Sequence, residues 1–171
     1  MKLRYLLFVC SLFVFVSLTC VHGQTTVILL RHAEKDLESG SDPGLSEKGR
    51  QRAKELVRVL ENVKIDAIYS TPFNRTKETV APLAENQELD IEEYNPFKLE
   101  EITAMLMKSE NKTFVFSGHS NTTPIFVNLL LGSQEYKQLN EADYDNLYIV
   151  TINKKGKSKV LELAYGEVSA F

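Results

Sequence analysis

Hydrophobic positions along the chain form short apolar runs that alternate with amphipathic stretches. Residues 26–30 and 113–117 are largely apolar, which is typical of strands that are covered on both faces of a sheet. The segments that predict strands are residues 26–30, 65–69, 89–92, 113–117, 147–152 and 159–164. The last two flank Lys155-Gly156-Lys157, and this arrangement predicts a closing hairpin.

The stretches between these runs have the periodicity and the end signals of helices. After Ser46, a single stripe collects the apolar residues Ala53, Leu56, Val57 and Leu60. We expect Thr71 to be the N-cap of a second helix with Pro72 in its first turn, a third helix over about residues 98–108, and a fourth that starts at Thr123-Pro124 and ends at Gly132. The alternation predicts one α/β domain, a three-layer α/β/α sandwich with a largely parallel sheet.

The first 23 residues have the pattern of a secretory signal peptide. Lys2 and Arg4 precede an apolar run, and Val21-His22-Gly23 suits cleavage after Gly23. An uncleaved anchor is the alternative, but the apolar run is shorter than the ~20 residues that a spanning helix needs. We therefore expect a secreted or periplasmic domain over residues 24–171, without stable membrane insertion once the signal peptide is removed.

Composition narrows the function of that domain. Both cysteines, Cys10 and Cys20, lie in the leader, so the domain has no disulfide, thiol nucleophile or cysteine zinc site. Without Lys2 and Arg4, 18 of the 20 basic residues remain against 23 acidic ones. Nucleic-acid binders usually show the opposite balance, so we expect no nucleic-acid partner.

The candidate chemistry lies at the ends of the predicted strands. His32 and His119, the two histidines outside the leader, each follow an apolar strand; Arg31 precedes the first of them, and Arg75 follows another strand. The carboxyl ends of parallel strands form the ligand crevice of such sheets, so these four side chains should converge. Two guanidinium groups suit a tetrahedral dianion, and neighbouring arginines keep a histidine nitrogen unprotonated for nucleophilic attack. The sequence thus predicts a phosphoryl site.

The bland alternatives are weaker. Either arginine taken alone could form an ordinary ion pair with Glu34 or Glu78. A zinc site needs three or four ligands, and the domain has no cysteine and no third histidine. The segment around Ser120 lacks the second glycine and the additional histidine of a serine hydrolase. We expect neither a metal ion nor a cofactor.

Four motifs in order resemble the histidine phosphatase superfamily, the phosphoglycerate-mutase-like group. They are Leu30 to Lys35, Gly44 to Gly49, Tyr69 to Pro72 with Arg75 to Thr79, and Ser117 to Thr122. The resemblance implies that His32 accepts the phosphoryl group and that Arg31, Arg75 and His119 hold it. Ala33, in place of the usual glycine, is similar to the small phosphohistidine phosphatases. Lys35 and Asn121 lie within these motifs and are candidate substrate-binding residues.

The general acid is the part that the motifs leave open. Ser120 stands where acid phosphatases of this group place an aspartate, and Glu92 and Glu93 are the counterparts of a glutamate in the mutases; we take Glu93 as the candidate. The short domain has little room for a cap over the site. We expect an exported, metal-independent phosphatase of broad phosphomonoester specificity with a phosphohistidine intermediate on His32. The alternatives are a protein phosphohistidine phosphatase and a non-catalytic phosphate-binding module.

Overall fold

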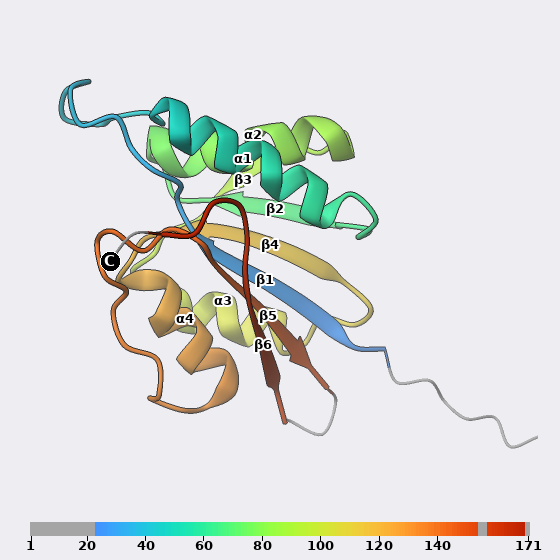
Figure 1. Ribbon diagram of the computed structural model, residues 1–171. Helices are drawn as coiled ribbons and strands as arrows, with labels where there is room; N and C mark the ends of the chain where they lie inside the picture. The colour runs from blue at the N-terminus through green and yellow to red at the C-terminus, as the bar shows by residue number, and fades with distance from the viewer. Residues whose placement is uncertain (1–22, 154–156, 170–171) are drawn as a thin grey trace, which may run out of the picture.

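A computed structural model of the protein describes residues 23–153 and 157–169. Its centre is one six-stranded sheet, which Figure 1 shows edge-on between two layers of helices. The strands are β1 (Thr25–Arg31), β2 (Ala67–Ser70), β3 (Ile91–Glu93), β4 (Thr113–Gly118), β5 (Asn146–Ile152) and β6 (Lys159–Ala164), in the order β3-β2-β4-β1-β5-β6. The first four of that order run parallel, whereas β5 is antiparallel to both β1 and β6. The predicted closing hairpin is confirmed, and its turn at residues 154–156 lies outside the described residues.

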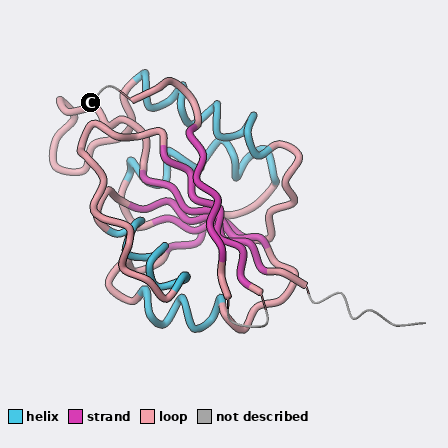
Figure 2. The backbone as a smooth tube through the Cα atoms, turned by 60° about the horizontal axis from the view of Figure 1, so that its bottom comes forward, coloured by secondary structure: helices cyan, strands magenta, loops and turns pink. Residues whose placement is uncertain are grey.

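Helices cover both faces of the sheet. α1 (Glu47–Leu60) and α2 (Asn74–Gln87) pack on one face, and α3 (Leu99–Leu106) and α4 (Thr122–Leu131) on the other (Figures 1 and 2). Strand β1 shows why both layers are needed: Ile28 and Leu30 belong to the core beneath α1 and α2, and Val27 and Leu29 to the core against α3 and α4. The three-layer α/β/α sandwich is thus confirmed.

The helix starts differ in detail from those expected. α2 begins at Asn74 rather than after Thr71, and its N-cap Phe73 provides no side-chain cap. The Thr71 hydroxyl lies 3.0 Å from Nε2 of His119 and 2.9 Å from the hydroxyl of Thr76, so it is not available to cap a helix. The prediction that Thr71 is the N-cap is therefore wrong. At the other end of the prediction, Gly132 does end α4 in the left-handed conformation that glycine adopts readily.

The proposed leader, residues 1–23, lies outside the described residues except for Gly23. Within residues 23–153 and 157–169, no helix is both long and apolar enough to span a bilayer.

Candidate active site

The parallel pairing of β1 with β4 brings the two histidines together. Arg31 and Gly118 are register partners at the ends of these strands, and the backbone N–H of His32 donates to the Gly118 carbonyl at 2.9 Å. The ring centroids of His32 and His119 are consequently 5.6 Å apart, edge to face. Both rings line a cavity of about 420 Å³, called the histidine cavity below. The convergence of the two histidines is as the strand ends predicted.

His32 is held in one tautomer. Its Nδ1 lies 2.8 Å from the carbonyl oxygen of Ala33, and because a carbonyl can only accept, Nδ1 carries the hydrogen and Nε2 keeps a free lone pair. The backbone around it is fixed as well, since the N–H of Ala33 donates to the Thr79 hydroxyl at 2.9 Å. The side chain is 4% exposed, and Nε2 is therefore an oriented nitrogen nucleophile in a nearly closed setting.

Burial lowers the pKa of His32 to about 3. The hydrogen bond to Ala33 opposes this shift, and the charges of Arg31, His119 and Arg75 add to it. The pKa of His119 falls to about 4, again mainly through burial and then through Arg75 and Arg31. Both imidazoles are therefore neutral over the whole physiological range, so the lone pair on Nε2 of His32 is available at neutral pH.

Three further residues named from the sequence line the same cavity: Arg75, Lys35 and Asn121. Arg75 extends from the first turn of α2, with its guanidinium carbon 4.5 Å above the Phe73 ring and one nitrogen 3.5 Å from Asp42. The Phe73 ring in turn packs edge-on against His119, with centroids 5.2 Å apart. Two cationic side chains thus face the neutral histidines, which is an arrangement suited to an anionic ligand.

Arg31 lies behind the cavity. Its side chain is 1% exposed, and one terminal nitrogen donates to the carbonyls of Asn140 and Asp143 at 2.8 Å, while the other binds Glu141 at 3.1 Å. Its guanidinium carbon is also 4.2 Å above the Tyr144 ring. Arg31 contributes positive charge to the site, but its terminal nitrogens would have to exchange partners to hold a phosphoryl group, and that role stays a prediction.

The remaining carboxylates named from the sequence lie elsewhere. Glu93 binds Lys77 and lines a neighbouring groove rather than the histidine cavity, so its role as the acid also stays a prediction. The ordinary ion pairs considered for the arginines are not formed. Glu34 binds Arg52 at 2.7 Å, and Glu78 accepts the backbone N–H of Leu45 at 2.7 Å.

Sequence reasoning missed Glu141. This carboxylate lines the histidine cavity, and its second oxygen accepts the Ser120 hydroxyl at 2.7 Å. The bonds to Ser120 and to Arg31 lower its pKa, that to Ser120 the more strongly, against a smaller opposing effect of burial. Glu141 belongs to an irregular segment between α4 and β5 that has no periodic pattern, so no local signal marked it. Phe73 could have been noted as an aromatic neighbour of Thr71-Pro72 and Arg75.

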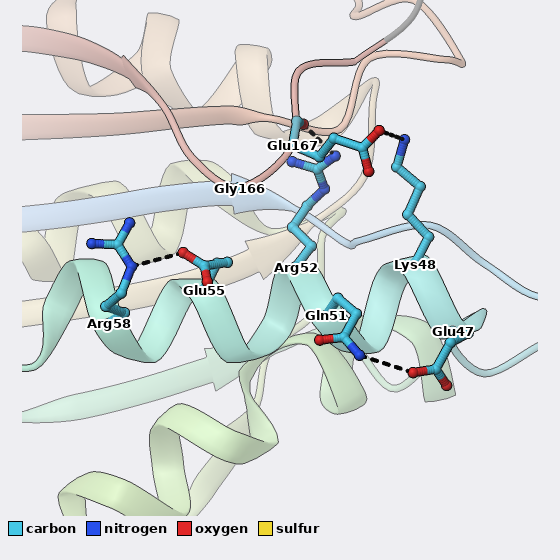
Figure 3. Close-up of a pocket in the computed structure, with 8 residues that line it drawn as sticks. All are labelled: Glu47, Lys48, Gln51, Arg52, Glu55, Arg58, Gly166 and Glu167. Carbon is cyan, nitrogen blue, oxygen red and sulfur yellow. Dashed lines mark hydrogen bonds and ion pairs between the residues drawn. The ribbon is translucent and has the colours of Figure 1, made fainter.

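A slightly larger cavity, of about 470 Å³, lies on the outer side of α1 and holds neither histidine (Figure 3). Its charged side chains are paired: Lys48 lies 3.4 Å from Glu167, and Arg58 lies 2.8 Å from Glu55. Arg52 binds the carbonyls of Tyr165 and Glu167 as well as Glu34. This region has no nucleophile, so the smaller histidine cavity is the candidate active site.

Metal-ligating side chains do not gather anywhere in the described ranges. Across residues 23–153 and 157–169, no group of three His, Cys, Asp or Glu residues has the geometry to hold a metal ion. The cations in and beside the histidine cavity are the side chains of Arg75, Lys35 and Arg31.

Comparison with known proteins agrees with this arrangement of residues. The sequence pattern of the histidine phosphatase superfamily (branch 1) matches residues 22–103, which include His32 and Arg75. The chain belongs to the histidine phosphatase superfamily. Within this superfamily, phosphoserine phosphatase 1 of Hydrogenobacter thermophilus is 38% identical over 71 residues. That match covers 38% of this chain and 34% of the relative, so it spans about a third of the relative's length.

Solved structures of other histidine phosphatases share the fold. The protein histidine phosphatase SixA, solved with tungstate, aligns with a TM-score of 0.68 at 16% identity over 81% of this chain and 96% of its own. YhfR of Bacillus stearothermophilus aligns with a TM-score of 0.65 at 19% identity over 85% of this chain and 98% of its own. At these identities the likeness establishes the phosphoglycerate-mutase-like architecture as a small single domain.

Proposed function

We propose that the protein hydrolyses phosphomonoesters through a phosphohistidine intermediate on His32, without a metal ion. One observation carries the proposal: a buried, neutral His32 has Nδ1 bound to a carbonyl and Nε2 free beside a cavity that Arg75, Lys35 and His119 also line. A free imidazole nitrogen next to paired cationic groups is what in-line attack on a phosphoryl dianion requires.

The reaction then proceeds in two displacements. In the first, the lone pair on Nε2 attacks phosphorus, the bond from phosphorus to the ester oxygen breaks, and the departing oxygen takes a proton. In the second, a water molecule attacks phosphorus, the P–N bond breaks, and inorganic phosphate leaves as neutral His32 is restored. Arg75 and Lys35 balance the charge on the equatorial oxygens, with the N-terminus of α4 beside them.

A second candidate follows from the position of the carboxylates. Glu93 is bound to Lys77 in the neighbouring groove, and Glu141 is held as an acceptor by Arg31 and Ser120. A site that lacks a free carboxylic acid favours leaving groups that need little protonation, such as an imidazole. A protein phosphohistidine phosphatase is therefore the alternative. Similarity to a phosphoserine phosphatase supports phosphomonoesters as substrates, and the pattern of residues 1–23 supports export to a secreted or periplasmic location.

The test is hydrolysis of p-nitrophenyl phosphate and of a panel of alkyl phosphates by the wild-type protein and by two variants. His32→Ala should lower kcat by at least about 10³-fold because it removes the nucleophile. Ser120→Ala should keep more than about a tenth of the activity, since a serine nucleophile has no part in the proposal. The absence of turnover on every ester, or an active His32→Ala variant, would overturn it.

A further inference from the structure

An aromatic groove of about 440 Å³ adjoins the histidine cavity. It is lined by Pro72, Phe73, Glu93, Tyr94, Asn95, Pro96 and Phe97. Three of these residues, Phe73, Pro96 and Phe97, line the histidine cavity as well. The two hollows are therefore continuous, and a molecule held by its phosphoryl group in one has a direct path into the other.

The groove is a fixed part of the fold. Its floor residue Tyr94 is 8% exposed, packs edge-on against Phe116, and donates its hydroxyl to the Ser117 carbonyl. The rim turns on Asn95, whose side-chain oxygen accepts the N–H of Phe97 at 2.9 Å and whose carbonyl accepts the N–H of Lys98 at 3.1 Å. A hollow with rigid walls can bind a ligand without first paying the entropy of ordering itself.

The rim exposes apolar surface that the fold does not use. Phe97 is 90% exposed, and Phe73 is 38% exposed while it also contacts both His119 and Arg75. The only charged side chain on the groove wall, within the described residues, is Glu93, and its charge is offset by Lys77. The surface next to the cationic cavity is therefore suited to an uncharged, apolar group.

We infer that the aromatic groove is a leaving-group subsite, which takes the apolar or aromatic organic group of a phosphomonoester whose phosphoryl group lies against His32. This inference rests on the proposed function, because it assigns the substrate class of the same site. It names the occupant as the ester's own organic group, since the shared walls Phe73, Pro96 and Phe97 make the groove continuous with the phosphoryl cavity.

Non-hydrolysable n-alkylphosphonates provide a test that does not depend on turnover. A fully buried methylene is worth about fourfold in affinity, and a groove open to solvent on one side should keep about twofold. From methylphosphonate to hexylphosphonate, five methylenes are added, so calorimetry should show Kd falling by roughly 30-fold. A Kd that is the same for both, or no binding of hexylphosphonate, would overturn the inference.

Variants locate the effect. Phe97→Ala should reduce the gain from methyl to hexyl to about fivefold, because a large part of the apolar contact is lost, and Phe97→Leu should restore most of it. Leu161→Ala, which truncates an exposed apolar residue on β6, should leave the gain at its wild-type value. Thermal unfolding will show that each variant is folded. If Phe97→Ala keeps the full gain, the groove is not the subsite.

The same series separates this inference from the proposed function. A protein that binds hexylphosphonate more tightly through Phe97 but turns over no ester retains the subsite and loses the proposed hydrolysis. A protein that hydrolyses ethyl and hexyl phosphate with equal kcat/KM, and binds the phosphonates equally, retains the hydrolysis and loses the subsite. Alcohols of these chain lengths differ little as leaving groups, so the comparison isolates the contact with the groove.

Discussion

The neutral state of buried His32 should make the protein's stability depend on pH in a defined way. In the folded protein its pKa is about 3, against a reference value of 6.5 in an unfolded chain. Between these values the unfolded state binds a proton that the folded state does not. The contribution of His32 to stability is therefore complete above about pH 6.5 and is lost as the pH falls from there towards 3.

The size of the effect at an accessible pH follows directly. At pH 5 the unfolded histidine lies 1.5 pH units below its pKa of 6.5 and is almost fully protonated, whereas the folded one remains neutral. Each unit corresponds to about 1.4 kcal/mol, so the free energy of unfolding should fall by about 2 kcal/mol between pH 8 and pH 5 through His32 alone. His119, whose pKa is lowered to about 4, acts in the same direction.

The assay compares urea unfolding of the wild-type protein and of His32→Gln at pH 8 and at pH 5. Gln is uncharged at both, and its amide can still donate to the Ala33 carbonyl. Carboxylates and His119 contribute similarly to both proteins, so the difference between their pH dependences isolates His32. We expect the wild type to lose about 2 kcal/mol more than the variant. Equal losses, or an NMR titration of the His32 ring with a midpoint near 6.5, would refute the reasoning.

Three further variants or conditions test the site. Arg75→Ala should lower kcat/KM for p-nitrophenyl phosphate by about 10²-fold and weaken inhibition by tungstate, because two charge-assisted hydrogen bonds to the phosphoryl oxygens are lost. Glu93→Gln should change the turnover of alkyl and nitrophenyl esters by less than about threefold, since Glu93 is bound to Lys77 outside the histidine cavity; a selective loss of about 10²-fold on alkyl esters would instead make it the acid. Hydrolysis should persist in EDTA, and loss on chelation that a divalent metal restores would contradict a metal-free mechanism.

The convergence of His32, His119 and Arg75 could be predicted from the sequence because it depends on local signals. Apolar runs mark the strands, and the geometry of a parallel sheet brings their carboxyl ends to one edge. The predicted segments 65–69 and 89–92 were each placed about two residues too early, as β2 begins at Ala67 and β3 at Ile91. Such shifts at strand ends did not affect which residues share the cavity.

The partners of these residues could not be predicted because they are set by tertiary contacts. Thr71 has the local signature of an N-cap, but its hydroxyl lies between His119 and Thr76. Arg31 bonds to a segment more than 100 residues further along the chain, which also provides Glu141. The exposure of Phe97 depends on how the turn at Asn95 directs the chain beside the cavity, and no periodicity encodes that direction.

The central claim is that Nε2 of His32 takes the phosphoryl group, and trapping the phosphoenzyme tests it most directly. The protein is mixed rapidly with a ³²P-labelled ester, quenched in alkali, digested and mapped by mass spectrometry. The account predicts label on the peptide that contains His32, stable in alkali and released in acid, as expected for a P–N bond, and its absence from His32→Ala. Label on Ser120, label that survives acid, or label that persists in His32→Ala would contradict the account.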